Sequence, residues 1–257
     1  MGHGASQNYD YALMAARRVA EGTPVILDFG CGSAQIVSKA RKQGIEAWGA
    51  DTFEDNIEAL PNIPEDVRPF VVRMQGGALP FPDSSFDVVV ANMVFEHIPW
   101  PRLGGALRET RRVLKPGGEL IATFPTCETW FEGHLRLYFP HILGRWPVLQ
   151  LAYLRACHAL RLGRARDAVE DRETWARSRQ AYFGSTIFLH RTHNATRLIS
   201  HALGGPVENL AADYMRFRLA GLFRGRLALL LRHRLISAIL NIICAKRAGL
   251  VLSVKRG

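Results

Sequence analysis

A glycine-containing turn near the start of the chain carries residue types that can hold a small charged ligand. The segment 28–34 (DFGCGSA) lies between an apolar run at 25–27 and a stretch with helical periodicity. Gly30 and Gly32 have no side chains, so a ligand can approach the backbone closely there. The N–H groups at the start of the following helix favour a negative or electron-rich group. Asp51 ends the next apolar run, where its carboxylate can accept both hydrogen bonds of a ribose diol.

Two kinds of site combine glycines with a distant acid, and two residues distinguish them here. A nicotinamide dinucleotide site uses the pattern G-x-G-x-x-G, which requires glycine at position 35, but this chain has Gln35. Asp28 adds an acid two residues before the first glycine. Both details favour the carboxylate end of S-adenosyl-L-methionine over a dinucleotide. A glycine turn in another kind of α/β protein is the remaining alternative.

The turn lies within a regular alternation of apolar runs and helical stretches. Strands are predicted at 25–27, 46–50, 70–72, 86–91, 119–124, 207–211 and 250–255, and helices at 9–20, 33–43, 55–60, 102–114 and 194–202. Ser33 is a candidate N-cap of the second helix. The alternation predicts a mostly parallel sheet with helices on both faces. Right-handed crossovers then bring the carboxyl ends of the strands to one edge, where ligands bind.

The chain of 257 residues is predicted to form a single domain, 1–257, with two helical insertions. The first insertion, 127–193, follows the fifth strand and is rich in Arg, Trp, Tyr and His. The second, 213–247, separates the last two strands and is basic and amphipathic.

Four segments together resemble a known family. They are VILDFGCGSA (25–34), WGAD (48–51), LPFPDSSFDVVVANMVFEHI (79–98) and LKPGGELIATFP (114–125). In this order and spacing they resemble the class I S-adenosylmethionine-dependent methyltransferases, in particular the ubiquinone/menaquinone-biosynthesis-like (type 11) group. The resemblance implies a Rossmann-like sheet of seven strands whose last strand runs antiparallel, with S-adenosylmethionine as cofactor.

The resemblance also implies a role for particular residues. Gly30 and Gly32 would face the methionine part of the cofactor, Asp51 the ribose, and Asn92 would line the site after the fourth strand. The cofactor-binding residues expected in full are Asp28, Gly30, Cys31, Gly32, Asp51, Thr52, Gly76, Gly77, Ala78 and Asn92.

Two positions depart from the family pattern. Ala34 replaces the usual third glycine of the turn, which a helix tolerates well. Gly77 stands where the family usually has an acid that bonds the adenine amino group. We therefore expect backbone groups, for example at Ala78, to hold the adenine, and cofactor affinity to be weaker than is typical.

The transfer of a methyl group from an activated donor depends mainly on holding two reactants in line, although a hydroxyl acceptor can also need a base. His97, just after the fourth strand, is the candidate base, with a turn-stabilising role as the alternative. Some quinone-precursor O-methyltransferases extend the Glu96-His97 pair into a metal site with an acid three residues earlier. Here that position is Met93, so no metal site is expected.

The first insertion follows the fifth strand directly, a position from which it commonly covers the acceptor pocket in the resembling family. The residues expected to line that pocket are His134, Tyr138, His141, His190 and His193. A helical hairpin that packs its own aromatic residues is the alternative for the first three, and plain surface histidines for the last two.

The net charge of +10 is concentrated near the C-terminus. No Asp or Glu follows position 213, and the remaining stretch holds ten basic residues: Arg216, Arg218, Arg224, Arg226, Arg232, Arg234, Lys246, Arg247, Lys255 and Arg256. One face of a predicted helix carries the apolar residues Leu235, Ile236, Ile239, Leu240, Ile242 and Ile243. An apolar face with flanking arginines favours an anionic membrane surface as partner. A helix packed on the sheet is the alternative, and nucleic acid is the least supported partner.

The four cysteines (Cys31, Cys127, Cys157 and Cys244) form no C-x-x-C pair, which argues against a disulfide framework. The N-terminus lacks the order of a signal peptide, and no run of about 18 apolar residues exists. We expect a cytoplasmic protein that associates peripherally with the inner face of a membrane.

The sequence thus predicts O-methylation of an apolar or lipid-linked small molecule, such as a quinone precursor, a phenol or a glycolipid. One alternative is a catalytically degenerate binding module at the membrane. Another is an RNA or protein methyltransferase, which the absence of an Asn-Pro-Pro-Tyr motif at Asn92 disfavours.

Overall fold

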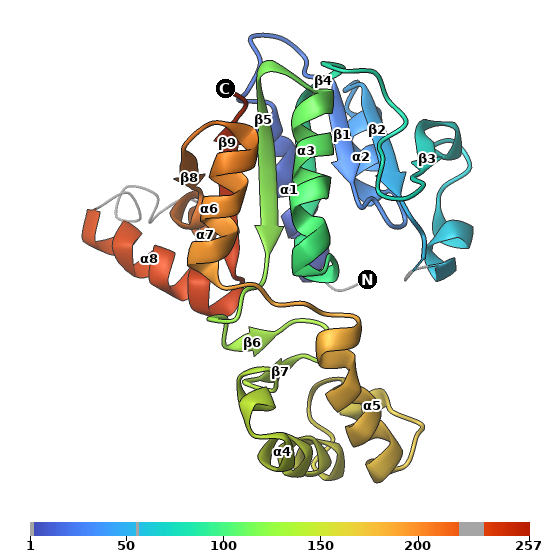
Figure 1. Ribbon diagram of the computed structural model, residues 1–257, viewed down its shortest axis with the longest axis vertical. Helices are drawn as coiled ribbons and strands as arrows, with labels where there is room; N and C mark the ends of the chain where they lie inside the picture. Colours follow the sequence, from blue (N-terminus) through green and yellow to red (C-terminus); the bar gives the residue numbers. More distant parts are fainter. Residues whose placement is uncertain (1–2, 55–56, 221–233) are drawn as a thin grey trace.

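The computed structural model describes residues 3–54, 57–220 and 234–257, and its centre is a seven-stranded sheet (Figure 1). The order is β3-β2-β1-β4-β5-β9-β8. The strands are β1 (Ile26–Phe29), β2 (Ala47–Asp51), β3 (Val71–Arg73), β4 (Phe86–Asn92), β5 (Leu114–Phe124), β8 (Val207–Asn209) and β9 (Leu250–Lys255). Pairing is parallel from β3 to β5, and β9 runs antiparallel between β5 and β8. The predicted Rossmann-like sheet with an antiparallel last strand is confirmed.

Helices cover both faces of this sheet (Figure 1). They are α1 (His3–Ala16), α2 (Gln35–Lys42), α3 (Trp100–Val113), α6 (Thr192–Leu203), α7 (Ala211–Ala220) and α8 (Arg234–Arg247). One core joins the sheet to α1, α2, α7 and α8, and the other joins it to α3 and α6. Short 3-10 turns complete the chain: η1 (Ile57–Asn62), η2 (Arg68–Phe70), η3 (Phe95–His97), η4 (Ile142–Arg145) and η5 (Gly163–Asp167).

Strand β4 shows why the sheet forms where the sequence predicts it. Val88 and Val90 enter the core on one face, and Val89 and Ala91 enter the core on the other. Successive side chains of a strand point to opposite faces, so a continuous apolar run is buried on both. Each fully buried aliphatic side chain of this size contributes roughly 1.5–3 kcal/mol. This burial fixes β4 at the centre of the sheet, with Asn92 at its carboxyl end.

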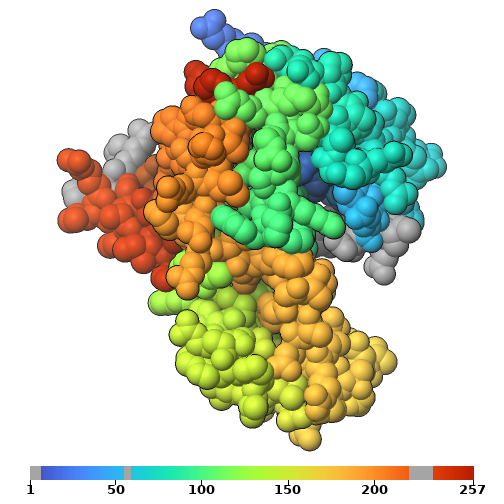
Figure 2. All heavy atoms as spheres, viewed as in Figure 1, coloured from blue at the N-terminus to red at the C-terminus, as the bar shows by residue number. Residues whose placement is uncertain are grey.

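Residues 127–190 form a separate lobe beyond the carboxyl end of β5, and a narrow waist joins it to the sheet (Figures 1 and 2). The lobe holds the hairpin β6 (Phe131–Glu132) and β7 (Leu137–Tyr138), then α4 (Pro147–Ala159) and α5 (Arg172–Ser185). It has a core of its own around Leu154 and Trp175. The role of a lid over an acceptor stays a prediction.

Several local predictions were wrong. The strand predicted at 207–211 ends at Asn209, with Ala211 already in α7, and the helix predicted at 9–20 ends at Ala16. Helix α2 is capped by Ala34, which has a left-handed φ of +55°, and not by the side chain of Ser33. Strand β5 begins at Leu114 rather than at 119. Leu114 pairs with Phe86, and an irregularity in the β4–β5 register follows, which lets the Lys-Pro-Gly-Gly segment continue as strand.

Candidate functional site

The glycine turn after β1 is tied to the end of β2. The N–H groups of Gly30 and Cys31 both donate to the carbonyl of Ala50, at 2.8 and 3.2 Å. Gly30 has a φ of +74°, and a Cβ there would lie 2.5 Å from Cγ2 of Val94. Val94 therefore fills the space where a side chain at position 30 would lie, and the contact of a ligand with the Gly30 backbone stays a prediction.

Asp51 closes the turn from the neighbouring strand. Its Oδ2 accepts a hydrogen bond from the Gly32 N–H at 2.8 Å, and its Oδ1 accepts one from the Phe53 N–H at 2.9 Å. The N–H of Gly32 is thus engaged within the protein. Thr52, next to Asp51, accepts a hydrogen bond at its carbonyl from Nε of Arg73 at 3.1 Å. The half-buried carboxylate stands at the edge where β1 and β2 end.

Asp28 lies buried beneath the same turn. Burial, and then the charge of Asp51, raise the pKa of Asp28 to about 8. Burial and the same two acids raise the pKa of the Cys31 thiol. Both groups are therefore protonated near neutral pH, so Asp51 supplies the negative charge of the turn and Cys31 is not a nucleophile.

The segment after β3 forms a tight exposed turn. Gly76 and Gly77 have φ values of +60° and +84°, and the N–H of Ala78 donates to the Gln75 carbonyl at 3.1 Å. A turn with two left-handed residues favours glycine, which explains Gly77 in place of an acid. Because the N–H of Ala78 closes this turn, the expected adenine contact would need another backbone group or an opening of the turn.

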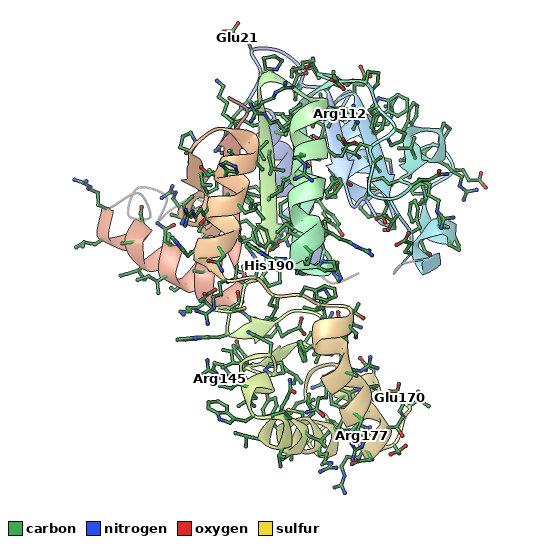
Figure 3. The ribbon with its side chains drawn as sticks, in the orientation of Figure 1. Glu21, Arg112, Arg145, Glu170, Arg177 and His190 are labelled. Atoms are coloured by element: carbon green, nitrogen blue, oxygen red, sulfur yellow. The ribbon has the colours of Figure 1, made fainter. Side chains whose placement is uncertain are left out.

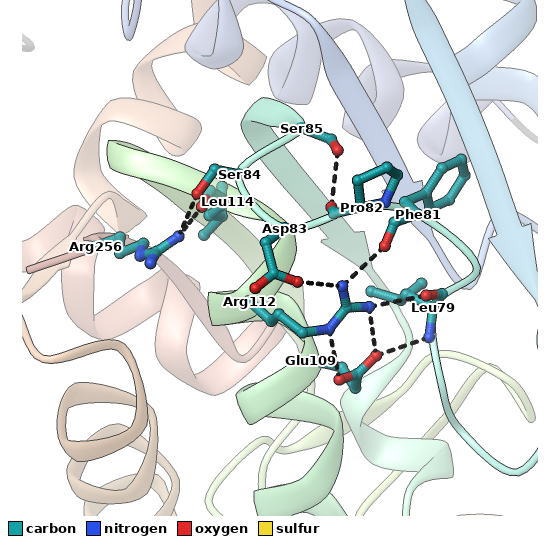
Figure 4. Close-up of polar contacts among 10 residues, drawn as sticks. All are labelled: Leu79, Phe81, Pro82, Asp83, Ser84, Ser85, Glu109, Arg112, Leu114 and Arg256. Atoms are coloured by element: carbon teal, nitrogen blue, oxygen red, sulfur yellow. Dashed lines mark hydrogen bonds and ion pairs between the residues drawn. The ribbon is translucent and has the colours of Figure 1, made fainter.

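Arg112 on α3 holds the loop that follows this turn (Figure 4). Its guanidinium donates to the carbonyls of Leu79 and Phe81, each at 2.8 Å. The same group pairs with Asp83 at 2.8 Å and with Glu109 at 2.8 Å. Glu109 in turn accepts the N–H of Leu79 at 2.9 Å. Sequence reasoning missed this network, whose signal was a charged pair on one helix face beside a proline-rich loop.

The carboxyl end of β4 leads into a second turn. Asn92 is half-buried at the end of the strand, beside Thr123 of β5. The chain then reverses through Met93, which has a φ of +59° and donates its N–H to the Thr123 carbonyl at 2.7 Å. Asn92 is therefore at the expected edge, and its contact with a cofactor stays a prediction.

His97 lies in η3, where the chain returning from the lobe meets the sheet. Its Nδ1 donates to the carbonyl of Thr186 at 3.2 Å, and the N–H of Phe188 donates to the carbonyl of Glu96 at 2.6 Å. These bonds support the turn-stabilising alternative for His97. Its role as a base stays a prediction.

A second histidine from the lobe meets His97. The rings of His97 and His134 are 5.3 Å apart between centroids and nearly perpendicular. Glu132, which is buried, accepts bonds from Nδ1 of His134 at 2.7 Å and from the N–H of Leu135 at 2.5 Å. Burial alone would raise the pKa of Glu132, but these bonds outweigh it and lower the pKa. Burial alone would lower the pKa of His134, but Glu132 outweighs it and raises the pKa.

Glu96 is the third member of the group that His97 and His134 form. Its side chain is fully buried, and neither carboxylate oxygen has a hydrogen-bond partner. Burial raises its pKa to about 8. Ligand atoms of Glu96, His97 and His134 all lie within 4.8 Å of one another. The third ligand of the metal site in the resembling enzymes would stand at Met93, whereas the structure brings in His134 from a distant part of the chain.

The other residues expected at an acceptor pocket differ in exposure and in their hydrogen-bond partners. Tyr138 is exposed, His193 is exposed on α6, and His141 bonds the Thr129 carbonyl within the lobe at 2.6 Å. His190 lies at the waist (Figure 3). It is buried, and its Nε2 is 3.0 and 3.1 Å from the carbonyls of Phe95 and Ile98. The surface alternative for His190 is wrong, because this histidine anchors the lobe to η3.

Much of the apolar face predicted for the second insertion points outward, but Leu240 of that face is buried. On α8, the exposed fractions of Leu235, Ile239 and Ile242 are 70%, 55% and 63%, whereas Leu240 and Cys244 are buried. Residues 221–233, which include Arg224, Arg226 and Arg232 of the basic stretch, lie outside the described residues.

Part of the basic charge is used internally. Arg216 donates to Ser237 at 2.9 Å and Arg218 to the Tyr214 hydroxyl at 2.9 Å. Arg247 stacks on Phe131 of the hairpin, with its guanidinium carbon 3.6 Å from the ring centroid. In the described part of the chain, no helix is long and apolar enough to cross a membrane.

Comparison with known proteins shows which proteins this chain is similar to. Residues 27–122 match a family model described as "Methyltransferase domain". A protein of Mycobacterium sp. (strain JLS) described as an uncharacterized methyltransferase is 33% identical over 131 residues, which are 51% of this chain and 50% of that protein. The demethylmenaquinone methyltransferase of Tropheryma whipplei (strain Twist) is 31% identical over 121 residues, which are 47% of this chain and 50% of the relative. The chain spans about half the length of these curated relatives.

A solved structure agrees over nearly the whole chain. The S-adenosylmethionine-dependent methyltransferase from Mesorhizobium loti has a TM-score of 0.52 and 15% identity, covering 96% of this chain and 100% of that one. At this identity the likeness shows the fold.

Proposed function

We propose that this protein transfers the methyl group of S-adenosylmethionine to an oxygen of an apolar or lipid-linked small molecule. The premise is that residues 27–122 form a class I methyltransferase domain of the matched family. The observation that carries the proposal is the meeting of the glycine turn and Asp51 at the carboxyl edge of the sheet. In open α/β sheets, ligands bind at this edge, beside the strand where the order reverses.

Asp51 is the residue on which cofactor binding should depend most. Its two oxygens already accept N–H donors from the turn, so the carboxylate is held in place before a ligand arrives. A ribose diol would donate to the remaining lone pairs of the same oxygens. The positive sulfonium of the cofactor would also be attracted to this charge.

Calorimetry of the purified protein with S-adenosylmethionine and with its demethylated product tests this role. Asp51→Ala should weaken binding at least tenfold, because one hydrogen bond to a charged group contributes about 1.5–3 kcal/mol and about 1.4 kcal/mol is tenfold in affinity. Asp66→Ala, at an exposed turn, is the matched control and should bind like the wild type. Equal affinity of all three proteins would remove Asp51 from the site, and no binding by the wild type would refute the proposal.

The reaction needs positioning more than it needs strong acid or base groups. The acceptor oxygen attacks the methyl carbon, the carbon–sulfur bond breaks, and the electron pair stays on sulfur. The proton of a hydroxyl acceptor must leave to a base. His97 donates from Nδ1 to the Thr186 carbonyl, so its neutral ring carries the lone pair on Nε2, as a base requires.

The acceptor is proposed to be apolar because of the surface beside the lobe. Helix α8 presents Leu235, Ile239 and Ile242 to the outside, with Lys246 and Arg247 in its last turn. Aliphatic side chains flanked by basic ones suit an anionic membrane surface. A protein attached there would meet lipid-linked acceptors directly. The similarity to a demethylmenaquinone methyltransferase supports a quinone precursor within this class, beside phenols and glycolipids.

A labelled-methyl transfer assay on membrane and small-molecule extracts, with mass identification of the product, tests the acceptor class. Label that enters a lipid-extractable or aromatic small molecule supports the proposal. Label that enters RNA or protein would overturn it. Cofactor binding without any turnover across these extracts would favour the non-catalytic module, for which the exposed glycine turn at Gly77 is the supporting observation.

A further inference from the structure

We propose that Glu96, His97 and His134 form a binding site for a divalent transition-metal ion of the zinc type, with two imidazole nitrogens and one carboxylate oxygen as ligands. The site joins η3, after β4, to the loop that follows β6 in the lobe. The proposal stands on four features: the spacing of the three groups, the orientation of the two rings, the state of the carboxylate and the chemistry of the donor set.

The spacing is close to that of a metal site. One ligand atom from each residue lies within 4.8 Å of the other two. Tetrahedral ligands at about 2.1 Å from zinc are roughly 3.4 Å apart, so the three side chains would need to move closer together by about an ångström to bind one ion. Shifts of this size are of the order that side-chain torsions can supply.

Both imidazole rings bind a protein acceptor through Nδ1, which is the arrangement usual for histidines that bind a metal through the other nitrogen. His134 donates from Nδ1 to the Glu132 carboxylate at 2.7 Å, and His97 donates from Nδ1 to the Thr186 carbonyl at 3.2 Å. In each neutral ring the lone pair is therefore on Nε2. A carboxylate or carbonyl that binds the far nitrogen fixes the ring and makes it a better ligand.

Glu132 is itself held firmly. It is buried, and it also accepts the backbone N–H groups of His134 at 3.0 Å and Leu135 at 2.5 Å. It can therefore set the orientation of the His134 ring without being a ligand.

Glu96 supplies an independent observation. Its carboxylate is fully buried and has no hydrogen-bond partner on either oxygen. A buried carboxyl group without a partner is costly, and buried charges are normally paired or bound to a metal. A divalent cation between Glu96 and the two histidines would satisfy this group.

The donor set selects the class of metal. Imidazole nitrogen suits zinc and its first-row neighbours, whereas magnesium and calcium prefer oxygen ligands alone. Three protein ligands leave a fourth position open for water or another oxygen ligand. If the proposed function holds, this position could take the acceptor hydroxyl, and the metal would then assist loss of its proton in place of His97 as a base.

Metal titration of chelator-treated protein without a histidine tag tests the site, with neither cofactor nor acceptor present. We expect one Zn²⁺ per chain by calorimetry, a rise in the thermal unfolding midpoint, and a visible Co²⁺ spectrum that Zn²⁺ abolishes. A hundredfold excess of Mg²⁺ should not displace the Co²⁺. Because no methyl transfer is measured, failure of this site is distinguishable from failure of the proposed function.

Four variants assign the ligands. Glu96→Gln and His134→Ala should each weaken Zn²⁺ binding at least tenfold, and Glu132→Gln should weaken it roughly 10–100-fold. His193→Ala, at an exposed histidine on α6, is the matched control and should bind like the wild type. Glu96→Gln keeps the size of the side chain, so it retains the fold if His134→Ala does not. No stoichiometric Zn²⁺ binding by the wild type, or unchanged affinity in Glu96→Gln, would overturn the proposal.

Discussion

The buried carboxyl of Asp28 makes the stability of this protein depend on pH in a direction that one substitution can test. In the unfolded chain this group has a pKa of 3.8, and burial beside Asp51 raises it to about 8 in the folded protein. Between these values the folded state binds a proton that the unfolded state has released. The contribution of Asp28 to stability is therefore fully present below about pH 4 and is lost as the pH rises toward 8.

The magnitude follows from the size of the shift. One pKa unit corresponds to about 1.4 kcal/mol, so the free energy of unfolding should fall by about 3 kcal/mol between pH 5 and pH 7 through this group. Asparagine has nearly the same shape and does not titrate. Asp28→Asn should therefore gain stability relative to the wild type at about 1.4 kcal/mol per pH unit across this range, and the gain should level off above pH 8.

Urea unfolding monitored by circular dichroism at pH 5, 6, 7 and 8 measures the free energy of unfolding of the variant and the wild type. Taking the difference between variant and wild type isolates Asp28 from other titrating groups. Asp66→Asn, at an exposed turn, serves as the control for removing one carboxyl group. If the curves of Asp28→Asn and the wild type run parallel from pH 5 to pH 8, the carboxyl of Asp28 is not held protonated and the reasoning is refuted.

Three further perturbations follow from the structure. Gly30→Ala should lower the free energy of unfolding by about 1–3 kcal/mol, because its Cβ would lie 2.5 Å from Cγ2 of Val94, and the added change Val94→Ala should recover part of the loss in chemical denaturation. Arg112→Lys should lower the free energy of unfolding by about 1–3 kcal/mol and speed proteolysis of the loop at 79–83, because an ammonium group cannot make the planar set of hydrogen bonds that the guanidinium makes. Equal proteolysis rates in the variant and the wild type would contradict this. Ile239→Glu should reduce co-sedimentation with anionic vesicles. The control Val169→Glu, at a fully exposed apolar residue of the lobe, should not reduce it. Equal pelleting of the wild type with neutral and anionic vesicles would exclude the electrostatic part of the membrane proposal.

Much of the fold could be predicted because it depends on the local spacing of apolar residues along the sequence. The apolar run of β4 is buried on both faces, which requires a central strand whatever surrounds it. The order of strands and helices then leaves few topologies, and Asp51 falls at the carboxyl edge in all of them. The details that sequence reasoning missed are those set by neighbours in space, such as the left-handed Ala34 at the start of α2.

The candidate site divides in the same way. The turn at 28–34 and Asp51 were predicted because they are close in sequence to the strands that position them. The network around Arg112 could not be predicted from spacing alone, since it depends on where α3 lies against the loop at 79–83. The expected pocket histidines were chosen by their position in the first insertion and just before the helix that follows it, and the structure brings His134 of that group against His97.

The sequence by itself determined the alternation of strands and helices, the glycine turn at 28–34 and the place of Asp51 at the end of β2, because periodicity and chain order constrain these features directly. The antiparallel last strand was expected from the family resemblance alone. Only the tertiary structure decided which face of α8 points outward, since periodicity tells which residues share a face but not what that face meets. The same holds for Glu96 and His134. Their contact depends on how the lobe folds back on η3, and the packing that achieves this involves residues far apart in the chain.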